Sequence, residues 1–166
     1  GVNGIDHLED LSEEKWDRLL DTNVKGIYKM SKALLPMLIE SKGTIVNIVS
    51  NAAHVPMTAS AAYNASKGAA KILTSQMARE LTRRHGITVF SGSPNKLSGT
   101  GMRDQIDQEV VRTRGWTLEQ AQAYQKQSLL AGDETPPVRV AEFLTFLLSD
   151  KERHRYLTGC DLQYGL

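Results

Sequence analysis

Apolar residues recur at intervals of three and four positions along two long stretches, residues 12–40 and 60–85. This spacing predicts two long helices, because positions i, i+3, i+4 and i+7 share one helical face. Ser12 is a favoured residue type for the N-cap of the first helix, and Gly86 is expected to end the second. Pro36 is expected to bend the last turns of the first helix.

Two short runs are apolar or β-branched without alternation, and they predict strands at residues 44–49 and 87–90, with a final short strand expected at residues 159–164. Continuous apolar runs are typical of parallel strands buried on both faces. Further helices are expected over residues 117–130 and 136–149. The alternation of helices and strands predicts an α/β fold of three layers, in which helices cover both faces of a doubly wound parallel sheet.

Two stretches are less regular, although the second includes the helix expected over residues 117–130. Residues 91–101 are rich in Gly, Ser, Pro and Asn and are expected to form a loop. Residues 97–136 are polar and are expected to be mobile. The whole chain, residues 1–166, has the length of one domain with a single core.

Composition narrows the function classes. The chain is 40% hydrophobic and 23% charged, with a net charge of +1, so nothing indicates binding to nucleic acid or to an anionic membrane. The single cysteine, Cys160, excludes an internal disulfide and favours a reducing compartment. No apolar run reaches the length of a membrane span, so we expect a cytoplasmic protein.

No metal site is expected, because the four histidines are far apart in the sequence and form no pair at metal-ligand spacing. They are interpreted as surface or capping residues, and the charged run at residues 151–155 is expected to be a solvated turn. The histidines are His7, His54, His85 and His154.

Three polar residues have a spacing that suggests proton chemistry. Ser50 follows the first predicted strand, and Tyr63 and Lys67 are i and i+4 on the second long helix, so their side chains share a face. A nearby ammonium favours the phenolate and is expected to lower the pKa of Tyr63, which would make it a usable general acid or base. Ligands of open α/β sheets gather at the carboxyl ends of strands, where Ser50 lies.

These residues resemble the short-chain dehydrogenase/reductase family over essentially the whole chain. The strand at residues 45–50 and the Tyr-Asn-Ala-Ser-Lys helix at residues 63–67 match the active-site signature of the family. The segment 21–26 looks like the one that carries its fourth catalytic residue. Pro94 and the pair at 158–159 are similar to positions after its sixth strand and at the start of its last one.

The resemblance implies a role for each member of the catalytic set. Tyr63 would be the acid or base, and Ser50 would stabilise the substrate oxygen. Lys67 would lower the pKa of the tyrosine and hold the nicotinamide ribose of NAD or NADP. Asn23 would hold a water molecule that links Lys67 to solvent.

The resemblance also implies contacts to cofactor and substrate. Asn95 stands where the family has Gly, and Thr100 lies about one residue later than the usual threonine. The segment 97–136 would set substrate choice. The implied cofactor residues are Gly1, Tyr63, Lys67, Pro94, Asn95 and Thr100, and the implied substrate-pocket residues are Ala52, His54, Val55, Leu97 and Met102.

The phosphate-binding start of the family pattern does not occur here, because no Gly-x-x-x-Gly-x-Gly follows a strand. Gly1 looks like the last residue of the family's Asn-Asn-Ala-Gly motif. We therefore expect a Rossmann-like fold that lacks the N-terminal phosphate-binding strands, and we expect the chain to be a fragment. The choice between NAD and NADP stays open.

The favoured hypothesis is an NAD(P)-dependent oxidoreductase that interconverts an alcohol and a ketone. By resemblance, it would form a homodimer or homotetramer through the helices at residues 12–40 and 60–85. Two alternatives remain. The first is a non-catalytic remnant that acts as an interaction or regulatory module. The second is a sugar-nucleotide epimerase or dehydratase, which the short chain after Tyr156 disfavours.

Overall fold

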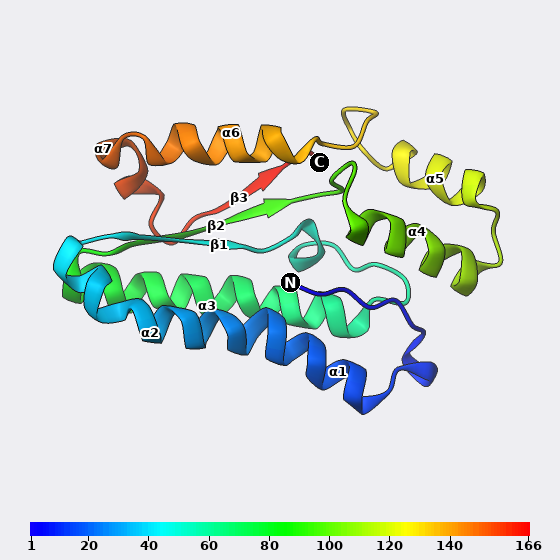
Figure 1. Cartoon of the computed structure of the whole chain (residues 1–166), viewed down its shortest axis with the longest axis horizontal. Coiled ribbons are helices and arrows are strands. Elements are labelled where there is room, and N and C mark those ends of the chain that lie inside the picture. The colour runs from blue at the N-terminus through cyan, green and yellow to red at the C-terminus, as the bar shows by residue number, and fades with distance from the viewer.

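A computed structural model describes all residues from 1 to 166. Three parallel strands form one open sheet in the order β1 (Thr44–Ile48), β2 (Thr88–Pro94) and β3 (Asp161–Tyr164) (Figure 1). The central strand β2 is buried along its whole length. This agrees with the continuous apolar run that predicted a strand covered on both faces.

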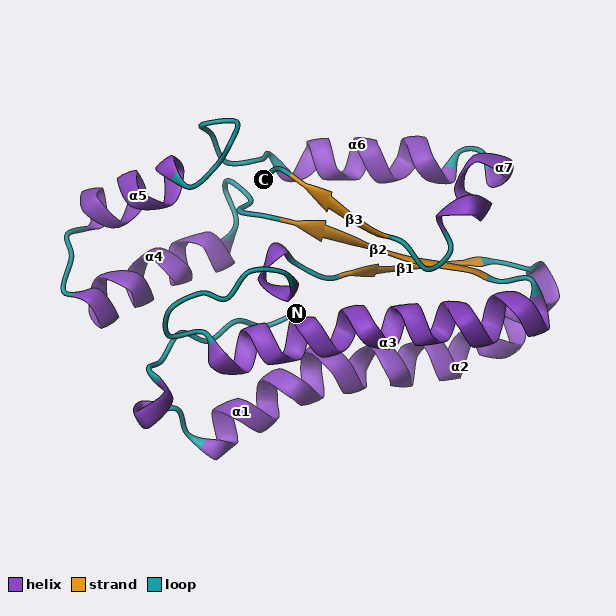
Figure 2. Ribbon diagram, turned by 180° about the vertical axis from the view of Figure 1, so that it is seen from behind, coloured by secondary structure: helices purple, strands orange, loops and turns teal.

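Helices cover both faces of the sheet, as the predicted three-layer α/β fold requires. The helices α1 (Glu13–Leu20), α2 (Gly26–Ser41) and α3 (Ala61–His85) lie on one side, and α6 (Pro137–Leu148) lies on the other (Figure 2). Ala78 on α3 packs against Ile87 and Val89 at the start of the central strand. The predicted fold class is confirmed.

The first long helix contains one irregularity that the periodicity did not reveal. Residues Asp21–Lys25 form a π-helical turn between α1 and α2, where one helix was expected over residues 12–40. Ser12 caps α1 as predicted and accepts a hydrogen bond from the backbone N–H of Lys15. Pro36 lies inside α2. A π-helical turn inside a helix often marks a functional site.

The second strand is longer than the sequence pattern indicated. Residues 91–94 were expected to be loop, but they continue β2 to Pro94. Ser91 pairs with Asp161 and Pro94 pairs with Tyr164, so the neighbouring strand β3 supplies backbone partners for a stretch with little β-propensity of its own.

The segment 97–136 contains two helices, α4 (Gly101–Arg114) and α5 (Leu118–Gln127). Only α5 was expected, because α4 is polar and lacks a clear apolar stripe. Its ends do carry helix signals. The Thr100 hydroxyl accepts a hydrogen bond from the Arg103 N–H, and Gly115 ends the helix with a φ of 66°. The expected mobility of this segment stays a prediction.

The charged run near the C-terminus is solvated as expected, except at His154, but it is helical instead of a turn. Residues Lys151–His154 form the short helix α7, and Arg155–Leu157 form a 3₁₀ turn. His154 is buried, and its ring nitrogens lie 2.8 Å from the Thr44 hydroxyl and 3.2 Å from the Leu147 carbonyl. Of the two interpretations of His154, the surface residue is wrong because the ring is buried, whereas its contact with the Leu147 carbonyl in the last turn of α6 agrees with a capping role.

None of these helices is both long enough and apolar enough to cross a membrane.

Candidate active site

The structure brings Ser50 and Tyr63 together at the carboxyl end of β1. Ser50 follows that strand and begins the short 3₁₀ helix η3 (Asn51–Ala53), where its hydroxyl accepts a hydrogen bond from the Ala52 N–H at 3.2 Å. Tyr63 lies in the first turn of α3 and is only 8% exposed, packed with Leu19, Ala52 and Ala62.

Burial raises the pKa of the Tyr63 phenol above its ordinary value, and the nearby Ser50 side chain partly opposes the rise. The shift is therefore opposite to the lowering expected from the spacing of Tyr63 and Lys67. The physical reason is that burial deprives the phenolate of hydration, and the neighbouring groups compensate only part of the free energy that is lost.

Lys67 lies one helical turn beyond Tyr63, with its ammonium nitrogen 5.8 Å from the centre of the tyrosine ring. The side chain is buried, and this burial lowers the pKa of Lys67. Its ammonium donates one hydrogen bond within the chain, to the carbonyl oxygen of Ile48 at 3.2 Å. Because an ammonium has three N–H groups, two remain free to donate to another molecule.

Asn23 is buried in the π-helical turn, and its amide pairs with the backbone of Val2 in both directions. The N–H of Val2 donates to Asn23 Oδ1, and Asn23 Nδ2 donates to the carbonyl oxygen of Val2, each at 2.9 Å. Nδ2 also donates to the Ser66 hydroxyl at 3.0 Å. Asn23 therefore fastens the N-terminal segment to α3, between Tyr63 and Lys67.

Gly1 lies against the same two polar side chains. A Cβ atom at this position would approach Asn23 Oδ1 to 2.9 Å and Lys67 Nζ to 3.4 Å. Because residue 1 is glycine, the N-terminal segment can lie close to Asn23 and Lys67, and a side chain there would crowd both.

The other implied cofactor residues follow β2. Pro94 is its last residue, and the Asn95 N–H donates to the carbonyl oxygen of Tyr164 at 3.0 Å. The φ of Asn95 is not positive, so its backbone conformation does not require glycine. Thr100 lies apart from the Ser50 and Tyr63 pair in sequence and in contacts, since its hydroxyl caps α4.

The implied pocket residues divide between two segments. Ala52, His54 and Val55 belong to the turn after Ser50, where Ala52 is buried and Val55 is exposed. Leu97 forms a parallel bridge with Thr135, and Met102 lies in the first turn of α4, partly buried.

Asn64 is a structural member of this site that was not included among the predicted site residues. Its Nδ2 donates to the carbonyl oxygens of Ala52 and Val55, at 2.6 and 2.8 Å, and its Oδ1 accepts from the Met57 N–H at 3.3 Å. The signal was its position in the first turn of a helix, where a short amide side chain commonly bonds nearby backbone.

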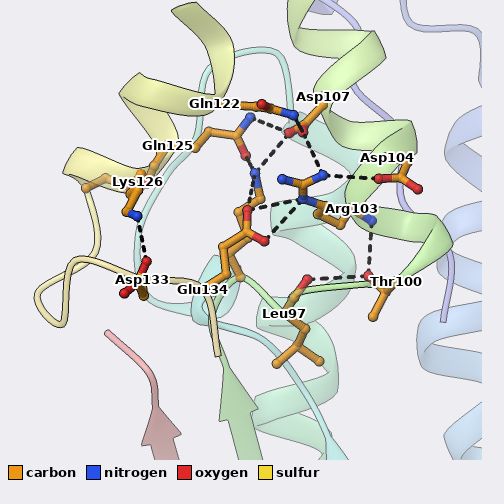
Figure 3. Close-up of polar contacts among 12 residues, drawn as sticks. Leu97, Thr100, Arg103, Asp104, Asp107, Gln122, Gln125, Lys126, Asp133 and Glu134 are labelled. Atoms are coloured by element: carbon orange, nitrogen blue, oxygen red, sulfur yellow. Dashed lines mark hydrogen bonds and ion pairs between the residues drawn. The ribbon is translucent and has the colours of Figure 1, made fainter. Parts of the chain in front are cut away.

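A buried ionic cluster holds the segment 97–136 in place (Figure 3). Asp107 on α4 is 2% exposed and accepts hydrogen bonds from Lys96, Gln122 and Gln125. Arg103 and Lys96 both pair with Glu134, each at 3.1 Å. Sequence spacing gave no sign of this cluster, because its members come from four separate segments.

Known proteins are similar to this chain over most of its length. A profile of the short chain dehydrogenase family matches residues 1–110. The chain is 36% identical over 160 residues to 2-(S)-hydroxypropyl-CoM dehydrogenase 3 of Xanthobacter autotrophicus, covering 96% of this chain and 59% of that protein.

Two solved structures have the same arrangement of elements. Sorbitol-6-phosphate 2-dehydrogenase from Erwinia amylovora superposes with a TM-score of 0.90 at 24% identity, over 99% of this chain and 64% of that one. A variant of actinorhodin polyketide ketoreductase with NADPH superposes with a TM-score of 0.89 at 25% identity, over 98% and 62% of the two chains.

The chain thus spans less than two thirds of the length of each of these three proteins. The family match covers more than half of the present sequence and includes Asn23, Ser50, Tyr63 and Lys67. The chain belongs to the short-chain dehydrogenase family.

Proposed function

We propose that this chain is the catalytic part of an NAD(P)-dependent oxidoreductase that interconverts an alcohol and a ketone. The observation that carries the proposal is that Ser50 lies beside the buried Tyr63, with the buried Lys67 one helical turn away. Family membership supports the reaction class, and a structural neighbour of this chain was solved with NADPH.

In this proposal Tyr63 exchanges the proton with the substrate oxygen, and the Ser50 hydroxyl donates a hydrogen bond to that oxygen. The raised pKa of Tyr63 keeps the phenol protonated near neutral pH, which suits the direction in which a ketone oxygen gains a proton. In the opposite direction Tyr63 must first lose its proton, and burial of the phenol opposes that loss.

The residues present fit the nicotinamide-ribose end of such a cofactor. The two N–H groups of the buried Lys67 ammonium that have no acceptor within the chain are suited to ribose hydroxyl oxygens. When bound, the nicotinamide supplies the hydride acceptor or donor. Asn23 places its amide beside the N-terminal segment and Ser66, from which position it would hold the water molecule that links Lys67 to solvent.

Replacement of Tyr63 by Phe in the natural protein tests the proton-transfer role. Tyr63→Phe removes only the hydroxyl, so turnover should fall by at least about 100-fold, the size of a lost general acid. Tyr156→Phe is the matched control, since Tyr156 is 75% exposed, and should keep wild-type turnover. Wild-type turnover by Tyr63→Phe would contradict the mechanism.

Cofactor binding separates this proposal from its rival, a non-catalytic interaction or regulatory module. The intact mass of the natural protein is compared with the 18.4 kDa of this chain, and the same species is titrated with NADH and NADPH by fluorescence. Saturable binding supports the oxidoreductase and reports its cofactor preference. The absence of binding to either would favour the non-catalytic module.

We also propose that the protein is a homodimer or homotetramer through α1–α2 and α3. Large apolar side chains are exposed on these helices, including Met30, Leu34, Met37 and Ile72. Small monomeric proteins rarely leave contiguous apolar patches uncovered. Light scattering of the natural protein coupled to gel filtration tests this, and replacement of Met37 and Ile72 together by Glu should reduce the measured mass to that of a monomer.

A further inference from the structure

We infer that Asp161, on the last strand, is a positioning residue for Ser50 that acts through His54. This inference rests on the proposed function and adds a residue to its site. Asp161 and Ser50 are far apart in the sequence, and the two are joined by the turn that follows Ser50. The segment from Ser50 to Met57 is here called the serine turn.

The Asp161 carboxylate is 9% exposed, and every partner it has in the chain is polar. Its Oδ1 accepts from the hydroxyls of Ser91 and Ser93, the latter at 2.8 Å, and its Oδ2 lies 2.7 Å from Nε2 of His54. Burying a carboxylate is costly unless hydrogen bonds satisfy it. Two serines on β2 therefore bind one carboxylate oxygen, and the other oxygen contacts His54 in the serine turn.

The ring of His54 is held from both sides, which defines its tautomer. Lys71 on α3 places its ammonium 3.3 Å from Nδ1 of His54. An ammonium can only donate, so Nδ1 accepts and Nε2 carries the proton that is donated to Asp161. Because both ring nitrogens have partners, the ring bridges α3 and β3 and has no nitrogen left for a substrate.

The serine turn has further contacts on the same two elements. Gln163 on β3 donates to the Asn51 side chain at 3.4 Å, and Asn64 on α3 donates to the carbonyl oxygens of Ala52 and Val55. Within the turn, the Ala52 N–H donates to the Ser50 hydroxyl. The orientation of that hydroxyl therefore depends on where the backbone of the turn lies, and His54 ties that backbone to β3.

The consequence for catalysis is geometric. Ser50 and Tyr63 must address the same substrate oxygen, and a misplacement of about 1 Å can cost about 100-fold in rate. Loss of the Asp161 contact would let the serine turn shift relative to α3, which carries Tyr63. Binding of the cofactor would be spared, because neither His54 nor Asp161 contacts Lys67 or Asn23.

The test is Asp161→Asn in the natural protein, with kcat, KM and the dissociation constant of the cofactor measured together. We expect kcat to fall about 10- to 100-fold. The cofactor dissociation constant should stay within twofold of wild type. Glu142→Gln, which removes an exposed carboxylate from an ion pair on α6, is the control and should leave all three unchanged. A folded Asp161→Asn protein with kcat within twofold of wild type would overturn the inference.

His54 variants separate positioning from a general loss of structure and serve where Asp161→Asn does not fold. His54→Gln keeps an N–H donor for Asp161 and should retain most of kcat, whereas His54→Ala should lose as much as Asp161→Asn. In the double variant the two losses should not add, because both remove one link. Additive losses, or a wild-type kcat in His54→Ala, would contradict the role of Asp161.

A measurement without turnover distinguishes failure of this inference from failure of the proposed function. Nitrogen NMR of His54 should show the proton on Nε2, and hydrogen exchange at the Ala52 and Ala53 amides should speed up at least tenfold in Asp161→Asn. If both results are obtained while Tyr63→Phe keeps wild-type turnover, the contact between His54 and Asp161 holds the serine turn as inferred, and the oxidoreductase mechanism is wrong. Unchanged hydrogen exchange at these two amides would overturn the inference about Asp161.

Discussion

The carboxylate of Asp107 lies 2.9 Å from the ammonium of Lys96, and this pair joins helix α4 to the residues just after β2. Gln122 and Gln125 donate to the same carboxylate from α5, so one buried charge holds both helices of the segment 97–136 (Figure 3). A polar segment in which the sequence predicted only one helix is thus organised around a single ionic centre.

Replacement of Asp107 by Asn should destabilise the protein by about 3 kcal/mol, because it leaves buried donors facing a neutral group. Chemical denaturation measures the loss, and hydrogen exchange should locate it in α4 and α5. Asp133→Asn is the control, since its pair with Lys126 is exposed, and it should change stability by less than about 0.5 kcal/mol. Equal effects of the two variants would contradict the importance of the buried pair.

Acid should weaken the same centre. Burial alone would raise the pKa of Asp107, but hydrogen bonds from Lys96 and Gln122 outweigh it and hold the pKa below the ordinary value of 3.8. A lowered folded-state pKa means that the stabilisation is present above pH 3.8 and is lost as the pH falls through the folded-state value. Stability measured from pH 5 to pH 2 should fall less steeply in Asp107→Asn than in wild type.

Asn23→Ala should cost about 2–3 kcal/mol, since it leaves both backbone groups of Val2 without their partner and removes the donor to the Ser66 hydroxyl oxygen. Thr22→Ala, at an exposed neighbour in the same π-helical turn, should change little. Urea denaturation of both variants gives the comparison. A loss of less than about 0.5 kcal/mol in Asn23→Ala would show that the N-terminal segment is fastened in another way.

Lys42 adopts a left-handed conformation at the end of α2, with a φ of 48° and a ψ of 50°. Lys42→Gly should therefore stabilise the protein by about 1 kcal/mol, because glycine has no steric penalty there. The same substitution at Lys29, exposed in the interior of α2, should destabilise it by about 1 kcal/mol. Thermal denaturation of the two variants should shift in opposite directions, and shifts of one sign would contradict the conformational argument.

The elements whose signals are local were predicted well. The ends of α3 and the cap at Ser12 depend on residues within a few positions, as does the shared face of Tyr63 and Lys67. The lowered pKa of Tyr63 was not found, because spacing reports a neighbouring charge and says nothing of how much water burial removes. The sequence likewise did not show that His154, within a charged run, is buried at the end of α7 with its ring against Thr44 of β1.

Short-range patterns were enough to predict the α/β alternation, to place Ser50 at the end of a strand, and to place Tyr63 and Lys67 on one face of a helix, because such signals depend on residues close together in the chain. Three features became visible only in the folded chain: β2 continues to Pro94, Asn23 forms hydrogen bonds with the backbone of Val2, and Asp161 contacts His54. Each of these depends on partners from separate segments, and a hydrogen bond between distant residues leaves no periodic trace in the sequence.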